Sequence, residues 1–195
     1  MTTLSHMSRP RTHEDSLRER LLDEATNLIA QGGAQALSLR TLVMTCDTST
    51  TAVYRLFGGR PQLLAAVLLR AAEEFTKTQR DTPAPEDAEE ALMELAWAYR
   101  AWALNNPHRF LVLFGQAIPE AETLTKALCH ARAPLLERAE QAVEQGRLNG
   151  PAEQLAAALW SSVHGCTLLQ LSGALPDQDE LFETVTRSAI RGWRP

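Results

Sequence analysis

The stretch SLRTLVMTCDTSTTAVYRLFGG (residues 38–59) decides how this chain is organised. Ser38 and Ser49 each precede a short run with helical apolar spacing, and serine is a preferred residue at a helix N-cap. A polar turn at residues 45–48 separates the two runs, and Gly58-Gly59 ends the second. Helices this short are not stable alone, so they must pack as a unit. The pattern predicts a helix-turn-helix.

The second of these helices, over residues 50–57, carries the chemistry of the unit. Its apolar side chains are needed inside, and the side chains predicted to point outward are Thr50, Thr51, Tyr54 and Arg55. Short hydroxyl groups permit close approach to a DNA major groove, and an arginine reaches a phosphate or a guanine edge. A solvated amphipathic hairpin has the same spacing. The spacing alone therefore leaves both interpretations open.

Charge is unevenly distributed along the chain. The net charge is −5, but residues 1–60 carry +1 and residues 61–195 carry −6. Within residues 27–62, three arginines stand against one acidic residue, Asp47. This distribution predicts a small basic face on an acidic body, which is compatible with a nucleic-acid partner despite the overall sign.

The remaining sequence repeats its apolar residues at intervals of three and four, which predicts an all-α protein of about nine helices. Besides the two short helices, the expected helices cover about residues 14–31, 61–80, 86–104, 107–115, 120–145, 151–173 and 178–192. The expected division is a flexible arm (1–13), a helix-turn-helix domain (14–60) and a ligand-binding and dimerisation domain (61–195).

Several protein classes lack support in the composition and motifs. Apolar runs are too short for a bilayer span, and the first residues do not resemble a secretory signal, so we expect a cytoplasmic protein with no membrane partner. Cys46, Cys129 and Cys166 lie in no CxxC pair and are interpreted as buried small hydrophobes. A metal or redox site built from Cys129, His130, His164 and Cys166 lacks the usual ligand spacing. We expect no cofactor, no metal and no enzymatic activity, since no catalytic motif is present.

The segment from Arg18 to Leu64 resembles the DNA-binding domain of TetR-family transcriptional regulators. LLDEATNLIAQGGAQALSLRTLV (21–43) and STTAVYRLFGGRPQLL (49–64) carry the resemblance. It implies that Tyr54 and Arg60 contact operator phosphates. Asp47 stands where the family usually has glycine, a position that aspartate tolerates. The full set of predicted DNA contacts is Arg40, Ser49, Thr50, Thr51, Tyr54, Arg55 and Arg60.

The sequence WSSVHG (160–165) resembles the WHG-type C-terminal domain found in many of these regulators. That resemblance implies a ligand-binding and dimerisation domain. Gly165 lets another helix approach closely, and the predicted dimer interface is Gly165, Leu168 and Leu169. His164 is either a core histidine bonded to a carbonyl, the interpretation we favour, or a ligand contact.

Aromatic residues are concentrated in residues 97–114, which suggests an apolar pocket between the fifth, sixth, seventh and eighth helices. Met93 and Trp97 are expected to form one wall, although core packing is the common fate of such residues. The predicted ligand-binding residues are Met93, Trp97, Phe110, Phe114, Trp160 and His164.

Together these features predict a homodimeric, ligand-responsive transcriptional regulator. We expect a repressor that binds a palindromic double-stranded operator and is released by an apolar or amphipathic small molecule. The alternative is a helical small-molecule-binding protein without sequence-specific DNA recognition.

Overall fold

Helices form nearly all of the described structure. The computed structural model describes residues 13–115 and 121–195, which contain nine helices and no strand, and the predicted all-α class is confirmed. All but the last residue of the predicted arm (1–13) lie outside the described residues. The helices are α1 (His13–Ala36), α2 (Leu39–Thr45), α3 (Thr50–Phe57), α4 (Arg60–Arg80), α5 (Ala88–Asn105), α6 (Pro107–Phe114), α7 (Ala121–Glu144), α8 (Ala152–Leu171) and α9 (Asp179–Arg191).

Serine caps open both short helices, as the sequence predicts. The Ser38 hydroxyl accepts a hydrogen bond from the Thr41 amide, and the Ser49 hydroxyl accepts one from the Ala52 amide at 3.2 Å. Gly58 ends α3 in the left-handed conformation, with φ of 90°. Each cap satisfies backbone groups that the helix itself leaves unpaired, so the boundaries of this unit are fixed locally.

The turn between α2 and α3 contains a residue with an unusual backbone conformation. Asp47 has φ of 47°, and it is the only non-glycine residue with positive φ in the described ranges. Glycine adopts this conformation without steric cost, and aspartate is among the few other residues that tolerate it. The expected tolerance of Asp47 for the turn is confirmed.

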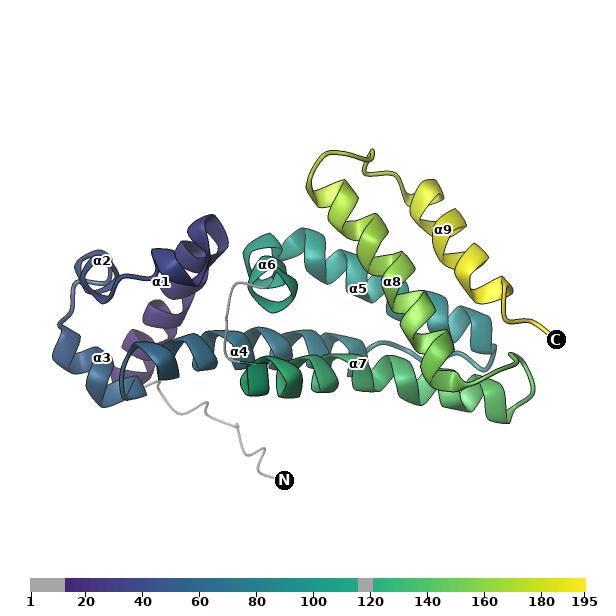
Figure 1. Ribbon diagram of the computed structural model, residues 1–195, viewed down its shortest axis with the longest axis horizontal. Coiled ribbons are helices and arrows are strands. Elements are labelled where there is room, and N and C mark those ends of the chain that lie inside the picture. Colours follow the sequence, from purple (N-terminus) through teal and green to yellow (C-terminus); the bar gives the residue numbers. More distant parts are fainter. Residues whose placement is uncertain (1–12, 116–120) are drawn as a thin grey trace, which may run out of the picture.

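Helix α4 connects the two parts of the molecule. It contacts α1 and α3 near its start and packs against α5, α6 and α7 further along, with α7 beside it over much of its length (Figure 1). Its buried stripe comprises Leu63, Leu64, Val67, Leu68, Ala71, Ala72, Phe75 and Gln79. Because one continuous helix touches both parts, a displacement of α4 changes the position of the helix-turn-helix relative to the larger domain.

A buried arginine holds the last two helices onto α5. The Arg100 guanidinium donates to Gln170 Oε1 and Asp179 Oδ1, both at 2.9 Å, and to Asp177 Oδ1. It also lies over the rings of Trp97 and Phe182, 5.5 and 5.1 Å from their centroids. One side chain of α5 thus fixes the end of α8, the following connection and the start of α9.

Replacing Arg100 with methionine is expected to lower the free energy of unfolding by about 2–4 kcal/mol, because it leaves buried Gln170 Oε1 without its donor and removes two cation–π contacts. Chemical denaturation followed by circular dichroism measures this. Arg80→Met is the matched control, since it breaks only an exposed ion pair with Glu137. Equal stability of the two variants would contradict the role given to Arg100.

None of the described helices is both long and apolar enough to cross a bilayer.

Candidate functional site

Helix α3 presents a polar face outward. Val53 is fully buried beneath it, whereas Thr50, Thr51 and Arg55 are exposed and Tyr54 is 58% exposed. The predicted outward orientation of this set is confirmed. Ser49 accepts a bond in its capping role, which leaves its hydroxyl proton available to a phosphate oxygen.

Arg55 has an intramolecular competitor for any DNA contact. Its Nη1 lies 3.4 Å from Glu14 Oε2 at the start of α1, and both side chains are more than half exposed. An exposed pair of this kind contributes about 0–1 kcal/mol. A phosphate or guanine can therefore displace Glu14 at little cost.

The two other arginines of the basic face have different surroundings. Arg40 is exposed on α2. Arg60, by contrast, donates from Nε to the Leu37 carbonyl at 2.8 Å and from Nη2 to the Ala34 carbonyl. Its guanidinium therefore ties the start of α4 to the end of α1. The predicted phosphate contact of Arg60 stays a prediction, and its two bonds to backbone carbonyls were not expected.

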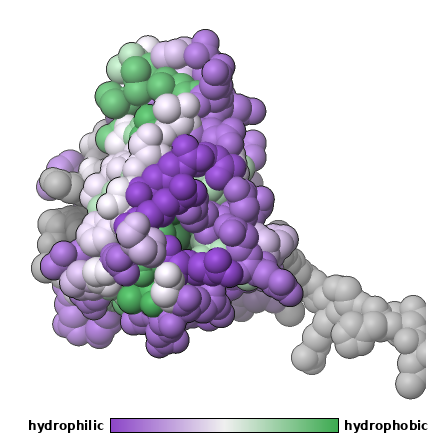
Figure 2. Space-filling model, turned by 90° about the vertical axis from the view of Figure 1, so that its right-hand side faces the viewer, coloured by the Kyte–Doolittle hydropathy of each residue, from purple (hydrophilic) through white to green (hydrophobic). Residues whose placement is uncertain are grey.

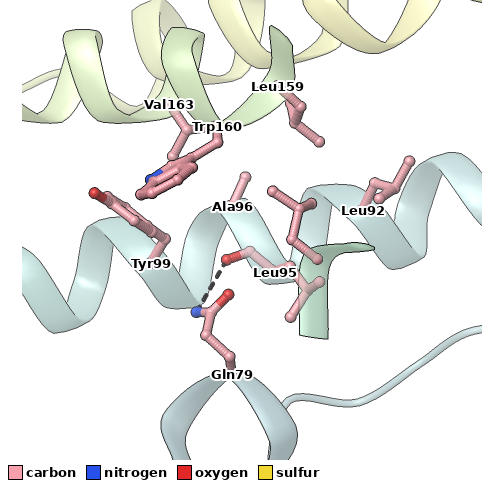
Figure 3. A pocket seen from close by; sticks show the side chains of 9 residues that line it. Gln79, Leu92, Leu95, Ala96, Tyr99, Leu159, Trp160 and Val163 are labelled. Carbon is pink, nitrogen blue, oxygen red and sulfur yellow. Dashed lines mark hydrogen bonds between the residues drawn. The ribbon is translucent and has the colours of Figure 1, made fainter. Parts of the chain in front are cut away.

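A small cavity lies between α4, α5, α7 and α8 (Figure 3). Its volume is about 20 Å³, enough for about one water molecule. The lining residues are Gln79, Leu92, Leu95, Ala96, Tyr99, Leu135, Leu159, Trp160 and Val163. We expected α6 to line the pocket, and for this cavity that expectation is wrong. Helix α4, which was not expected there, lines it instead through Gln79.

Of the six predicted ligand-binding residues, Trp160 alone lines this cavity. Met93 is packed in the core, and Trp97 contacts Phe182 on α9, with the ring centroids 4.8 Å apart. The expected wall of Met93 and Trp97 facing the aromatic residues of α6 is therefore wrong. Much of α5 is buried, so apolar spacing could not distinguish its cavity face from its α9 face.

The remaining predicted residues form an aromatic cluster behind the cavity. Phe110, Phe114 and His164 pack against one another, with ring centroids 5.1–5.4 Å apart. Phe114 also contacts Trp160, which lines the cavity, and Phe75 of α4. Tyr99 and Phe75 also belong to this cluster and were not among the predicted ligand-binding residues, although Tyr99 lies within the aromatic segment 97–114.

His164 has a different partner from the one expected. Its Nδ1 lies 2.7 Å from the Tyr99 hydroxyl, so the predicted carbonyl partner is wrong. Burial lowers the pKa of the His164 imidazole and raises the pKa of the Tyr99 hydroxyl. Both groups are therefore neutral at neutral pH, and the pair adds no charge to the surroundings of the cavity.

Ion pairs on the other side of α6 join it to α1 and α4. Arg109 of α6 contacts Asp23 of α1 at 3.4 Å and Glu74 of α4 at 3.1 Å. Arg70 of α4 contacts the same two carboxylates. His108 adds a hydrogen bond to Asn27 of α1 at 2.8 Å. Helix α6 thus touches the aromatic cluster on one side and α1, the helix that precedes the helix-turn-helix, on the other.

The predicted dimer residues lie on α8. Leu168 and Leu169 are 40% and 44% exposed, which is unusual for leucines of this molecule, and space is open beside Gly165. Figure 2 shows apolar surface near the top of one end face, at the level of the connection between α8 and α9, above a largely hydrophilic body. Exposed apolar surface of this kind is typical of an interaction site.

The cysteines divide into two kinds. Cys46 and Cys166 are buried, as expected, whereas Cys129 on α7 is exposed, so its interpretation as a buried hydrophobe is wrong. Burial raises the pKa of both buried thiols. Among the described residues, no group of three or more potential ligands is placed to hold a metal ion.

Comparison with known proteins defines the class. Residues 21–67 match the sequence profile of bacterial regulatory proteins of the tetR family, and residues 92–189, half of the chain, match the tetracyclin repressor-like C-terminal domain. The second match includes the Trp160–Gly165 stretch. The chain belongs to the TetR family of transcriptional regulators.

Individual relatives agree with this assignment. An HTH-type transcriptional regulator of Mycobacterium bovis, Mb1846, is 25% identical over 61% of this chain and 52% of its own length. This chain thus spans about half the length of that curated relative. A protein of unknown function from Rhodococcus sp. RHA1 has a TM-score of 0.80 at 24% identity, covering 96% of this chain and all of the other. A TetR-family regulator from Marinobacter aquaeolei VT8 has a TM-score of 0.78 at 20% identity, covering 93% and 97%. At these identities the two structures show the shared fold.

Proposed function

We propose that this regulator is a cytoplasmic repressor that binds a palindromic operator as a homodimer and releases it when a small molecule binds. The observation that carries the proposal is the polar face of α3, with four side chains exposed over a rigidly capped helix. Hydroxyl groups, a phenol and an arginine on one exposed helix suit a DNA major groove, where both phosphates and base edges are within reach.

The proposed DNA contacts follow from this face. Arg55 reads a base edge or a phosphate after leaving Glu14, and Tyr54 binds a phosphate. Arg40, which is exposed on α2, contacts the phosphate backbone of the DNA. Arg60 acts chiefly by fixing α4 to α1, so its effect on DNA binding is mainly through position. The predicted contact set remains Arg40, Ser49, Thr50, Thr51, Tyr54, Arg55 and Arg60.

The proposed dimer uses the exposed apolar side chains of α8. One recognition helix reads only a few base pairs, whereas two helices related by a twofold axis read an inverted repeat. Leu168 and Leu169 support such an interface because burying them against a second copy removes apolar surface from water.

The proposed release mechanism runs through α6 and α4. A ligand between α5, α7 and α8 would displace Trp160, which contacts Phe114 of α6. Opposite Phe114, Arg109 is paired with α1 and α4, so a shift of α6 changes how the DNA-binding unit is held. A ligand moves this equilibrium only by its differential affinity for the two arrangements, commonly 5- to 150-fold, or about 1–3 kcal/mol.

Asp23 provides a test of this route, since its carboxylate pairs with both Arg70 and Arg109. We expect Asp23→Asn to reduce operator release by about 2- to 30-fold for the compound that best releases the parent protein in a screen of aromatic and lipophilic molecules. The same compound should raise the melting temperature of both proteins equally. Glu122→Gln, which breaks an exposed pair within α7, is the control. Undiminished release in Asp23→Asn would contradict this route.

A pull-down of genomic DNA fragments followed by sequencing separates the proposed function from the alternative of a small-molecule-binding protein without sequence-specific recognition. We expect recovery of a few discrete loci that share a sequence. Recovery of fragments in proportion to their abundance would favour the alternative.

A further inference from the structure

The lining of the cavity contains no charged side chain among the described residues. Six of its residues are aliphatic, and Trp160 and Tyr99 add aromatic surface. A charged ligand would lose its hydration there without gaining a counter-ion, which is strongly unfavourable in a protein interior. The cavity therefore disfavours ligands with a formal charge.

Gln79 is the lining side chain that presents an amide. It is buried on α4, and its Nε2 donates to the Leu95 carbonyl at 3.4 Å, which is long for such a bond (Figure 3). In the part of the chain that the structure describes, Gln79 Oε1 accepts no hydrogen bond. The Tyr99 hydroxyl is paired with His164, and the Trp160 side chain is its second hydrogen-bond partner. The acceptor left free at the cavity is thus Gln79 Oε1.

We propose that the cavity selects an uncharged, largely apolar molecule with one hydrogen-bond donor, and that Gln79 is the residue that recognises this donor. The inference rests on the proposed function, because it takes this cavity as the effector site. A hydroxyl or N–H group of the ligand donates to Gln79 Oε1, and the apolar remainder lies against α5 and α8.

Entry requires the cavity to widen, because its present volume of about 20 Å³ is that of one water molecule. Leu135 and Trp160 are the lining side chains that remain partly exposed, so they are the ones that a ligand displaces. Since Gln79 belongs to α4, a ligand bonded to it acts directly on the helix that begins beside the DNA-binding unit.

Three naphthalenes with one substituent each test this inference on the full-length protein: 1-naphthol, 1-methylnaphthalene and 1-naphthoate. They share a ring system but present a donor, a methyl group and a carboxylate at neutral pH. By isothermal titration we expect 1-naphthol to bind about two- to tenfold tighter than 1-methylnaphthalene, the usual range for one neutral hydrogen bond. We expect 1-naphthoate to bind at least about tenfold weaker than 1-naphthol.

Gln79→Leu and Gln79→Met are expected to bind 1-methylnaphthalene at least as well as the parent and to lose the preference for 1-naphthol. Gln141→Leu, at an exposed position of α7, should retain the preference. Tighter binding of 1-naphthoate, an unchanged preference in both Gln79 variants, or no binding of any naphthalene would overturn the inference.

Operator release measured in parallel separates this inference from the proposed function. If the protein prefers 1-naphthol as expected but 1-naphthol does not change operator affinity, the result would support the role of Gln79 and contradict ligand release. Operator release by 1-naphthoate alone would support ligand release and overturn the inference.

Discussion

We expect Arg55→Ala to lower operator affinity at least about tenfold, because a good arginine contact to a base contributes about 1–3 kcal/mol and the proposed symmetric dimer would lose two such contacts. If Arg55 also neutralises a phosphate, the dependence of log affinity on log salt concentration becomes shallower by about one unit per lost contact. Fluorescence anisotropy with a labelled operator at several salt concentrations measures both effects.

Arg147→Ala is the matched control for charge. Arg147 is exposed in the connection between α7 and α8, and its removal changes the net charge by the same amount. That connection lies at the opposite end of the molecule from α3 (Figure 1). It should leave affinity within about twofold at moderate salt, since charges more than a Debye length apart are largely screened. Equal affinity and salt slope for Arg55→Ala and the parent would remove Arg55 from the interface.

If the proposed dimer forms through α8, we expect Leu168→Glu to split it and to lower operator affinity about a hundredfold or more. In the proposed interface the substitution would bury a carboxylate from each subunit among apolar side chains, which costs several kcal/mol. A monomer then reads half of the operator and loses the second set of contacts. Analytical ultracentrifugation measures the first effect, and anisotropy with the labelled operator measures the second.

Leu69→Glu on α4 is the control for added charge on an exposed leucine, because Leu69 is 39% exposed and Leu168 is 40% exposed. It should remain dimeric and bind the operator normally. A Leu168→Glu protein that sediments as an intact dimer would show that the subunits meet through another surface.

The DNA-binding unit could be predicted almost entirely from sequence because its signals are local. Ser38, Ser49 and Gly58 each fix a helix end through bonds to residues at most four positions away. Asp47 can occupy the turn because aspartate is one of the few non-glycine residues that tolerate a positive φ. The apolar spacing around buried Val53 then predicted which side of α3 faces outward.

The ligand domain was less predictable because its determinants are long-range contacts between buried helices. Trp97 faces α9 rather than the expected aromatic wall, and apolar spacing cannot choose between two buried faces of one helix. The roles of Arg100 and Gln79 could not be predicted from a local motif, because their hydrogen-bond partners lie 70 and 16 residues away along the chain. The bonds of Arg60 to the Leu37 and Ala34 carbonyls likewise could not be predicted, because these partners lie 23 and 26 residues away.

Selection of bound duplexes from a random library tests the central claim most directly, namely that α3 reads a palindromic operator. We predict one enriched motif made of two inverted half-sites, with centres separated by about one helical turn or a multiple of it. A selection that enriches no motif, or one that enriches a motif without inverted symmetry, would contradict the account.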